Sequence, residues 1–215
     1  MTLTIGVDVG GTKVLGGVVD ESGNILEKAR RDTPRQGGAE LTKTIAEVVI
    51  ENDANAAAWG EAVFGAGRGQ AQMLMLTVGT GIGGGIVVDG RLHRGAFGTA
   101  AEIGHMRVVP EGHLCGCGAR GCFEQYASGS GLMRHVREAV AATPDLARNL
   151  LALGDGTLDG LKGHHVTEAA RAGDVVALAA FNTTAQWLGA GIASLAVILD
   201  PCLLYTSDAA DEGLG

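Results

Sequence analysis

The chain has 215 residues, of which 46% are hydrophobic, so it can bury a core and is not expected to be disordered. Its formal net charge is −8, with 24 acidic and 16 basic residues, which argues against nucleic-acid binding by broad charge attraction. The first residues lack the features of a signal peptide, and the most apolar stretch, 189–199, is too short to cross a bilayer. We therefore expect a soluble, cytoplasmic protein with no membrane or nucleic-acid partner.

The first quarter of the chain predicts strands over residues 3–8, 14–20 and 25–31, because β-branched residues there alternate between turn signals. A helical pattern over residues 38–49 then overlaps a strand pattern over 48–51 with no turn between them. A well-specified fold avoids such a local conflict.

The central and last parts of the chain predict a mixture of helices and strands. A glycine-rich turn over residues 79–85 joins two strands, and the last 14 residues have three acids, no bases and no clear period. We interpret residues 202–215 as a read-through or expression scar rather than native sequence. The expected strands are 73–78 and 86–88, with a hairpin turn before residues 91–92, and the expected helices are 54–65, 131–142, 145–153, 166–172 and 175–199.

Two glycine-rich turns each lie between predicted strands. Asp8-Val9-Gly10-Gly11-Thr12-Lys13 is the first, and Gly79-Thr80-Gly81-Ile82-Gly83-Gly84-Gly85 is the second. Glycines let backbone N–H groups approach a phosphate, and Asp8 could hold a hydrated Mg²⁺ through water. The pair could clamp one nucleotide from two sides; the alternative is two ordinary hairpin turns.

Polar residues with a candidate catalytic or binding role follow at three places. Asn52 and Asp53 stand where a strand gives way to a helix, so either could be an N-cap, and Asp53 could instead accept a proton from a substrate hydroxyl. Glu102 and Glu124 flank a cysteine-rich segment. They could bind the hydroxyls of a sugar, or each could be a solvated surface charge.

Three of the four cysteines, Cys115, Cys117 and Cys122, lie within eight residues. This spacing favours a metal site over a disulfide framework in a cytosolic protein. With one His they form a standard tetrahedral Zn²⁺ set, and four protein ligands would make the zinc structural. His105 and His113 are both candidates for the fourth ligand.

The motifs DVGGTK, ENDANAAAWGE, TVGTGIGGG, EIGH and CGCGARGCFEQYASG, in this order, resemble the ROK family of sugar kinases, and among them its bacterial glucokinases. The resemblance is dense over residues 4–129. It implies an α/β, actin-like ATPase (ribonuclease H-like, hexokinase-type) fold in which two domains close over a cleft. It also implies ATP-dependent phosphorylation of the glucose 6-hydroxyl at the entry to glycolysis, with Mg²⁺ as cofactor, by a homo-oligomer.

The resemblance also implies a role for each matching residue. Asp53 would be the general base, and His105 rather than His113 would complete the structural Zn²⁺ site while its other ring nitrogen binds sugar. The sugar-binding residues would be Asn52, Glu102, His105 and Glu124. The nucleotide- and phosphate-binding residues would be Asp8, Gly10, Gly11, Thr12, Lys13, Gly79, Thr80, Gly81 and Gly83. The zinc ligands would be His105, Cys115, Cys117 and Cys122.

The chain also departs from the family pattern. Family members carry a further strand, helix and sugar-binding loop before Asn52, and a glycine-rich adenosine-binding segment after residue 201. The chain therefore resembles an internally deleted, C-terminally truncated glucokinase with an incomplete fold. We expect a partial small domain over 1–53 with the first phosphate loop and Asp53, a larger domain over 54–201 with the second phosphate loop and the zinc loop, and a tail over 202–215.

Three other functions remain as alternatives. The chain could be a non-catalytic, zinc-binding fragment of a kinase. It could be a kinase for another hexose (mannose, fructose or N-acetylglucosamine), or use polyphosphate in place of ATP. A transcriptional repressor of the same family would begin with a winged helix-turn-helix, whereas this sequence opens with a predicted strand.

Overall fold

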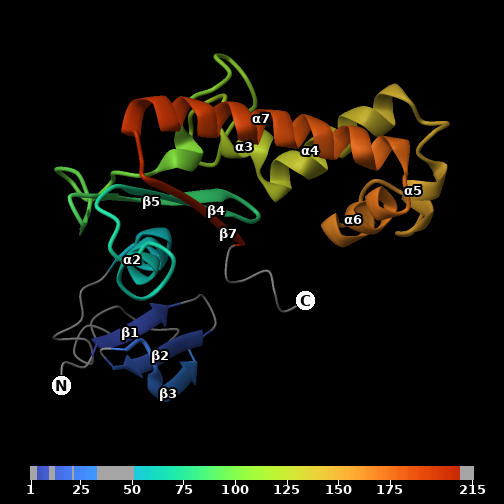
Figure 1. Ribbon diagram of the computed structural model, residues 1–215. Coiled ribbons are helices and arrows are strands. Elements are labelled where there is room, and N and C mark those ends of the chain that lie inside the picture. Colours follow the sequence, from blue (N-terminus) through green and yellow to red (C-terminus); the bar gives the residue numbers. More distant parts are fainter. Residues whose placement is uncertain (1–3, 10–12, 21, 33–50, 209–215) are drawn as a thin grey trace.

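The computed structural model describes residues 4–9, 13–20, 22–32 and 51–208, which form two β-sheets and a set of helices (Figure 1). The first sheet is antiparallel, in the order β1-β2-β3, and it confirms the three predicted strands with ends shifted by about one residue. Its strands are β1 (Thr4–Val9), β2 (Lys13–Val19) and β3 (Ile25–Asp32). The competing helix and strand patterns over residues 38–50 lie outside the described residues.

The second sheet has the strand order β6-β5-β4-β7. Its strands are β4 (Met73–Val78), β5 (Ile82–Val88), β6 (Arg91–Leu92) and β7 (Leu203–Asp208). Strand β5 begins earlier than predicted, so three glycines expected in a turn lie within it. Strand β7 was not expected; it pairs in parallel with β4, from Met73 opposite Leu203 to Val78 opposite Asp208. Its apolar residues explain the pairing, because Leu204 packs on one side of the sheet and Leu203 and Tyr205 on the other.

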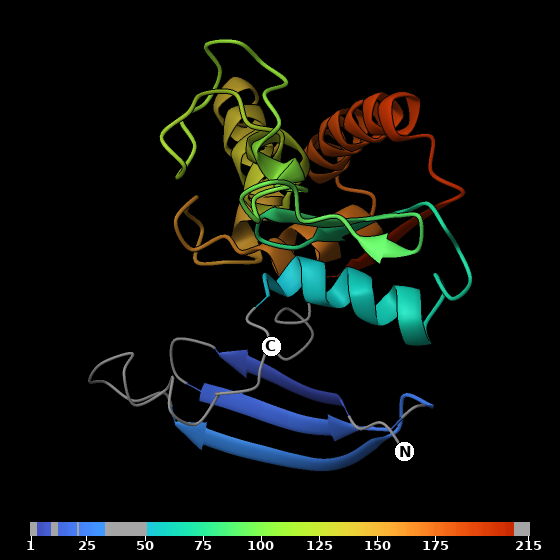
Figure 2. The ribbon, with the colours of Figure 1, turned by 90° about the vertical axis from the view of Figure 1, so that its left-hand side faces the viewer.

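Helix α2 (Asp53–Phe64) covers one side of the second sheet, and helix α7 (Val175–Leu199) covers the other (Figure 1). The alternation of strand β4 explains this arrangement. Its residues Met73 and Met75 pack with Ala58 of α2, whereas Leu74 and Leu76 pack with Leu195 of α7. The three-stranded sheet lies beyond α2, as Figure 2 shows from the side.

Two short elements that the sequence did not predict connect the second sheet to the helices. They are the 3₁₀-helix η1 (Ile103–His105) and helix α3 (Glu124–Ala127). Three further helices precede α7, and all four follow the predicted order, with α5 shorter than expected and α6 beginning about three residues earlier than expected. They are α4 (Gly129–Ala142), α5 (Arg148–Ala152), α6 (Gly163–Arg171) and α7.

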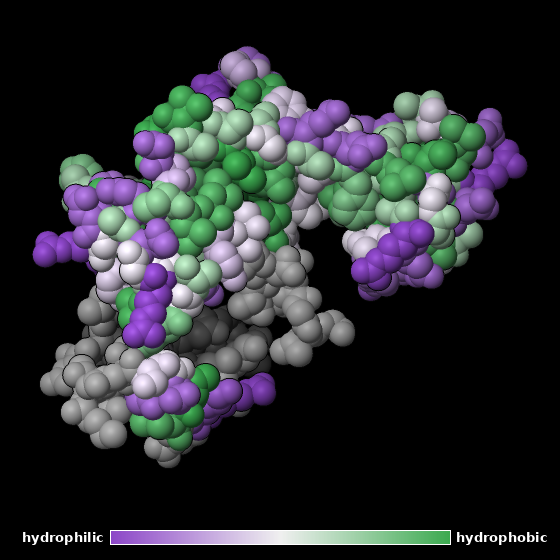
Figure 3. All heavy atoms as spheres, in the orientation of Figure 1, coloured by the Kyte–Doolittle hydropathy of each residue, from purple (hydrophilic) through white to green (hydrophobic). Residues whose placement is uncertain are grey.

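Helices α4 to α7 share an apolar core at the end of the molecule away from the first sheet (Figure 1). Leu150, Val136 and Val166 are completely buried in it. The exposed surface of the molecule mixes hydrophilic and hydrophobic residues over these helices (Figure 3). By length and composition alone α7 could also cross a membrane, and 22% of its most apolar window is buried; core helices of soluble proteins pass the same test.

Candidate functional site

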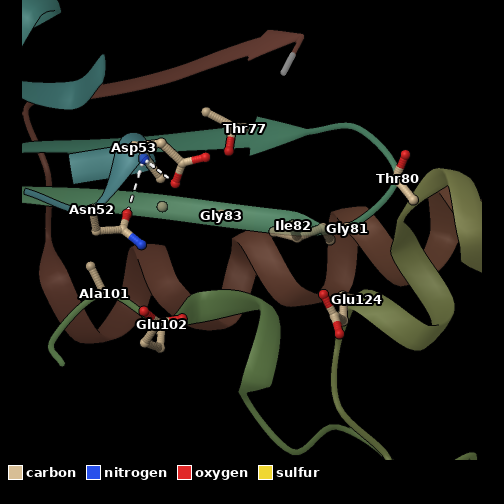
Figure 4. A pocket seen from close by; sticks show the side chains of 12 residues that line it. Asn52, Asp53, Thr77, Thr80, Gly81, Ile82, Gly83, Ala101, Glu102 and Glu124 are labelled. Carbon is tan, nitrogen blue, oxygen red and sulfur yellow. Dashed lines mark hydrogen bonds between the residues drawn. The ribbon is translucent and has the colours of Figure 1, made fainter. Parts of the chain in front are cut away.

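A pocket of about 330 Å³ opens where the start of α2, the β4–β5 turn, η1 and α3 approach one another (Figure 4). This volume lies at the lower end of the range of about 300–1,000 Å³ that small-molecule sites occupy. Two carboxylates from distant parts of the chain stand across the pocket from Asp53 (Figure 4). The pocket is lined by Asn52, Asp53, Ala54, Thr77, Thr80, Gly81, Ile82, Gly83, Gly84, Ala101, Glu102 and Glu124.

The N-terminus of helix α2 positions the predicted general base. Asn52 is the N-cap, since its Oδ1 accepts the N–H groups of Ala54 at 2.9 Å and Asn55 at 3.2 Å. Asp53 is the first helical residue, and its Oδ1 accepts the Ala54 N–H at 2.8 Å. Asp53 is also the acidic residue in the first turn of this helix. The structure thus assigns capping to Asn52 and leaves Asp53 at the pocket wall.

The turn between β4 and β5 is anchored to the N-terminus of α4. The Gly129 N–H donates to the Gly79 carbonyl at 2.8 Å, and the Ser130 N–H donates to the Thr80 carbonyl at 3.2 Å. A Cβ at Gly81 would stand 2.8 Å from Oε2 of Glu124, so glycine lets that carboxylate approach the turn. These contacts fix the turn beside the pocket, while its role in phosphate binding stays a prediction.

Other residues predicted to bind phosphate have different surroundings. Gly83 lies in β5, where a Cβ would come within 2.9 Å of Ala54 Cβ and 2.7 Å of Thr77 Oγ1. Its glycine is therefore required by the packing of α2 on the strand. In the first glycine-rich turn, Asp8 ends up in β1 and Lys13 in β2, and Gly10, Gly11 and Thr12 lie outside the described residues.

Glu124 connects the pocket with the cysteine segment. Its Oε1 accepts a hydrogen bond from Cys115 Sγ at 3.1 Å and lies 3.9 Å from His105 Nδ1. Its Oε2 faces Gly81 at the pocket. Glu102, the residue before η1, also lines the pocket. The structure therefore brings both predicted glutamates to one cavity.

The predicted metal ligands His105, Cys115, Cys117 and Cys122 come together in the structure, with their donor atoms within 4.8 Å of one another. The separation is 3.6 Å both from Cys115 Sγ to His105 Nδ1 and from Cys117 Sγ to Cys122 Sγ. Tetrahedral zinc with bonds of about 2.0–2.3 Å needs donor separations of about 3.5–3.8 Å. Two donor pairs already have this separation and all four donors lie within 4.8 Å, so the four side chains could hold a zinc ion.

Acid–base properties differ among the three thiols of this cluster. Burial raises the pKa of Cys115 to about 12, and burial also raises the pKa of Cys122. The pKa of Cys117 is lowered, mainly by the backbone N–H of Ala119. Because a metal binds the thiolate form, occupation of the site would release protons.

The competing ligand His113 points elsewhere. Its Nε2 lies 3.4 Å from Oε1 of Glu138 on α4, and its backbone N–H donates to the Tyr126 hydroxyl at 2.9 Å. Within the described part of the chain, the group of side chains that could hold a metal ion contains His105 and not His113.

Two residues stand differently from the predicted sugar site. His105 is not among the residues that line the pocket, and its Nδ1 faces the cysteines, so a part in sugar binding through its other ring nitrogen stays a prediction. Thr77 does line the pocket and was not predicted. The sequence does contain a signal for Thr77: it is a polar residue near the end of the apolar strand MLMLTV, just before the glycine-rich turn.

Comparisons with known proteins agree with the family resemblance of the motifs. The family model described as ROK family matches residues 4–49 and 41–204. A glucokinase of Streptomyces coelicolor is 43% identical over 266 residues, covering 99% of this chain and 84% of that protein. A solved ROK family glucokinase from Streptomyces griseus, in complex with glucose and AMPPNP, has a TM-score of 0.76 and 42% identity, covering 96% of this chain and 83% of that one. A solved ROK hexokinase from Thermus thermophilus has a TM-score of 0.78 and 30% identity, and the match covers 96% of this chain and 82% of that one.

The chain belongs to the ROK family of sugar kinases, which have the actin-like ATPase fold. It is an enzyme of the phosphotransferase class. The matched span of 266 positions exceeds the 215 residues present here, and the two family matches overlap at residues 41–49. The relatives thus have residues within the matched span that this chain lacks; a single missing segment before Asn52 stays a prediction.

Proposed function

We propose that this protein transfers a phosphoryl group from ATP to the 6-hydroxyl of glucose. The observation that carries the proposal is the pocket in which Asp53 stands opposite Glu102 and Glu124 (Figure 4). One carboxylate can take a proton while the others bind the hydroxyl groups of a hexose. The similarity to glucokinases, one of them solved with glucose and AMPPNP, supports glucose as the substrate.

In this mechanism Asp53 accepts the proton of the attacking hydroxyl, at an oxygen that the start of α2 holds at the pocket wall. Asn52, Glu102 and Glu124 hold the remaining hydroxyls and orient the sugar, and orientation supplies a large part of such rate enhancements. The β4–β5 turn faces the same pocket and binds the phosphates of ATP. Asp8 would hold Mg²⁺ through water, and the ion would supply positive charge against the phosphates of ATP.

We also propose a structural Zn²⁺ at His105, Cys115, Cys117 and Cys122. The convergence of the four donors within 4.8 Å supports it. Cys115 and His105 both approach Glu124. The metal-bound loop would therefore hold this glutamate toward the sugar. The second ring nitrogen of His105 would also help to bind the sugar. The protein is proposed to act in the cytoplasm, as a homo-oligomer, on glucose and ATP.

The direct test is glucose-dependent formation of ADP by the purified chain with Mg²⁺. Asp53→Asn should lower kcat by about 10²–10⁴-fold, the usual contribution of a general base. Asp159→Asn, an exposed aspartate at the helical end, is the matched control and should keep full activity. Substantial residual turnover in Asp53→Asn would exclude Asp53 as the base.

A second candidate is phosphorylation of another hexose, which the similarity to the Thermus thermophilus hexokinase favours. Comparing kcat/KM for glucose, mannose, fructose and N-acetylglucosamine, each with ATP and with polyphosphate, separates these substrates. A chain that binds one equivalent of zinc and phosphorylates none of them is instead a non-catalytic fragment.

A further inference from the structure

An ion pair joins the segment before α2 to the loop after β6, outside the pocket lining. The Arg94 Nε donates to Oε2 of Glu51. The Glu51 side chain is 17% exposed and that of Arg94 is 49% exposed. Arg94 belongs to the loop that continues to Ala101 and Glu102 at the pocket, and Glu51 directly precedes Asn52. The pair therefore connects the two segments that carry opposite sides of the pocket.

The second oxygen of Glu51 holds the start of α2. Its Oε1 accepts the Asn52 backbone N–H at 3.2 Å and the Asn55 side-chain amide at 3.1 Å. Burial alone would raise the pKa of Glu51, but the hydrogen bonds from Arg94, Asn52 and Asn55 outweigh it and lower the pKa. Glu51 is thus held as a carboxylate that can accept all of these bonds.

Asn55 shows that this arrangement has a cost. Its side chain is 1% exposed, and Oδ1 is buried without a hydrogen-bond partner in the described structure. A buried unsatisfied oxygen is unfavourable. Glu51 fixes the orientation of the amide, because turning it over would place Oδ1 against the carboxylate. Two of the polar contacts at the start of α2, from the Asn52 N–H and from the Asn55 side-chain amide, thus share one acceptor, Glu51.

We propose that Arg94 is a positioning residue, which fixes Asn52 and Asp53 at the pocket through Glu51. The guanidinium restrains one carboxylate oxygen, and the other oxygen then restrains the backbone at Asn52, one residue from the general base. The proposal rests on the proposed function, because it assigns Arg94 a part in orienting the base of that reaction. A misplacement of about 1 Å can cost about a hundredfold in rate.

The test combines kinetics with amide hydrogen exchange on the full chain. Arg94→Ala should lower kcat by about tenfold to a hundredfold with the KM for ATP unchanged, and Arg94→Lys should restore part of the loss. Because both residues act through one contact, Arg94→Ala combined with Glu51→Gln should be no worse than the more damaged single variant. Arg148→Ala is the control: it removes an exposed ion pair with Asp145 at 2.7 Å and should leave kcat unchanged.

Hydrogen exchange provides a readout that does not depend on turnover. Amides of residues 51–56 should exchange faster in Arg94→Ala and in Glu51→Gln than in the wild-type chain, and Arg148→Ala should match wild type. Unchanged exchange in Arg94→Ala overturns the proposal, as does faster exchange in an active enzyme whose kcat does not fall. If the wild-type chain phosphorylates no hexose, the proposed function fails, and exchange alone decides whether Arg94 fixes this segment.

Discussion

The helical end of the molecule and the cysteine loop differ in how much apolar surface they bury. Helices α4 to α7 bury an apolar core in which Leu150 and Val166 have no exposed surface. The loop over residues 105–122 has two isolated backbone bridges, Arg107 with Cys122 and Leu114 with Arg120, and leaves Leu114 61% exposed. Hydrophobic burial can stabilise the first region, whereas we expect a metal ion to stabilise the second. Substitutions in each region can therefore separate the two contributions.

The largest stability effect is expected at the cysteine loop. Cys117→Ser should abolish zinc binding and lower the free energy of unfolding by about 4 kcal/mol or more, because loss of a metal is among the few changes that reach this size. Mass spectrometry measures the zinc content, and thermal unfolding measures the loss of stability. Cys202→Ser is the matched control, since this exposed cysteine lies outside the cluster. Metal content equal to wild type in Cys117→Ser would remove this residue from the ligand set.

A smaller effect, without loss of zinc, is expected at the helical end. Leu150→Ala should lower the free energy of unfolding by about 2–5 kcal/mol, because it leaves a cavity in the apolar core. Leu146→Ala, at a leucine that is 58% exposed in the same region, should have little effect. If Leu150→Ala also released zinc, the two regions would be one cooperative unit rather than two.

The smallest of these effects is expected outside both regions, where α2 meets the second sheet. A Cβ at Gly85 would collide with the Cβ of Ala58, so Gly85→Ala should lower the free energy of unfolding by about 1–3 kcal/mol. Gly60→Ala is the control, because nothing lies within 4 Å of its added Cβ and alanine favours the helix. Denaturant unfolding compares the variants; equal stability of Gly85→Ala and wild type would show that the helix can move away from the strand.

Sequence patterns located much of the fold because local signals were strong. The strand over residues 73–78 and the helix over 175–199 match their predictions, since a buried apolar run and a long helical pattern each lie between clear breaks. Strand β7 was missed because its pairing with β4 depends on residues about 130 positions away. The start of β5 at Ile82 was missed for a related reason. Glycines 83–85 lie in this strand because they allow α2 to pack on it, and a contact between distant segments leaves no local sequence pattern.

For the site, the sequence by itself determined which residue types are available: two glutamates, an Asn-Asp pair at a helix start and a His/Cys₃ ligand set. Their order along the chain also determined the family. The family resemblance already implied His105 rather than His113 as the fourth ligand. Only the tertiary structure decided that Asn52 rather than Asp53 is the helix cap, and that Glu124 faces both the cysteine cluster and the pocket. These choices depend on distances between segments far apart in the chain, and such distances are set by packing rather than by spacing.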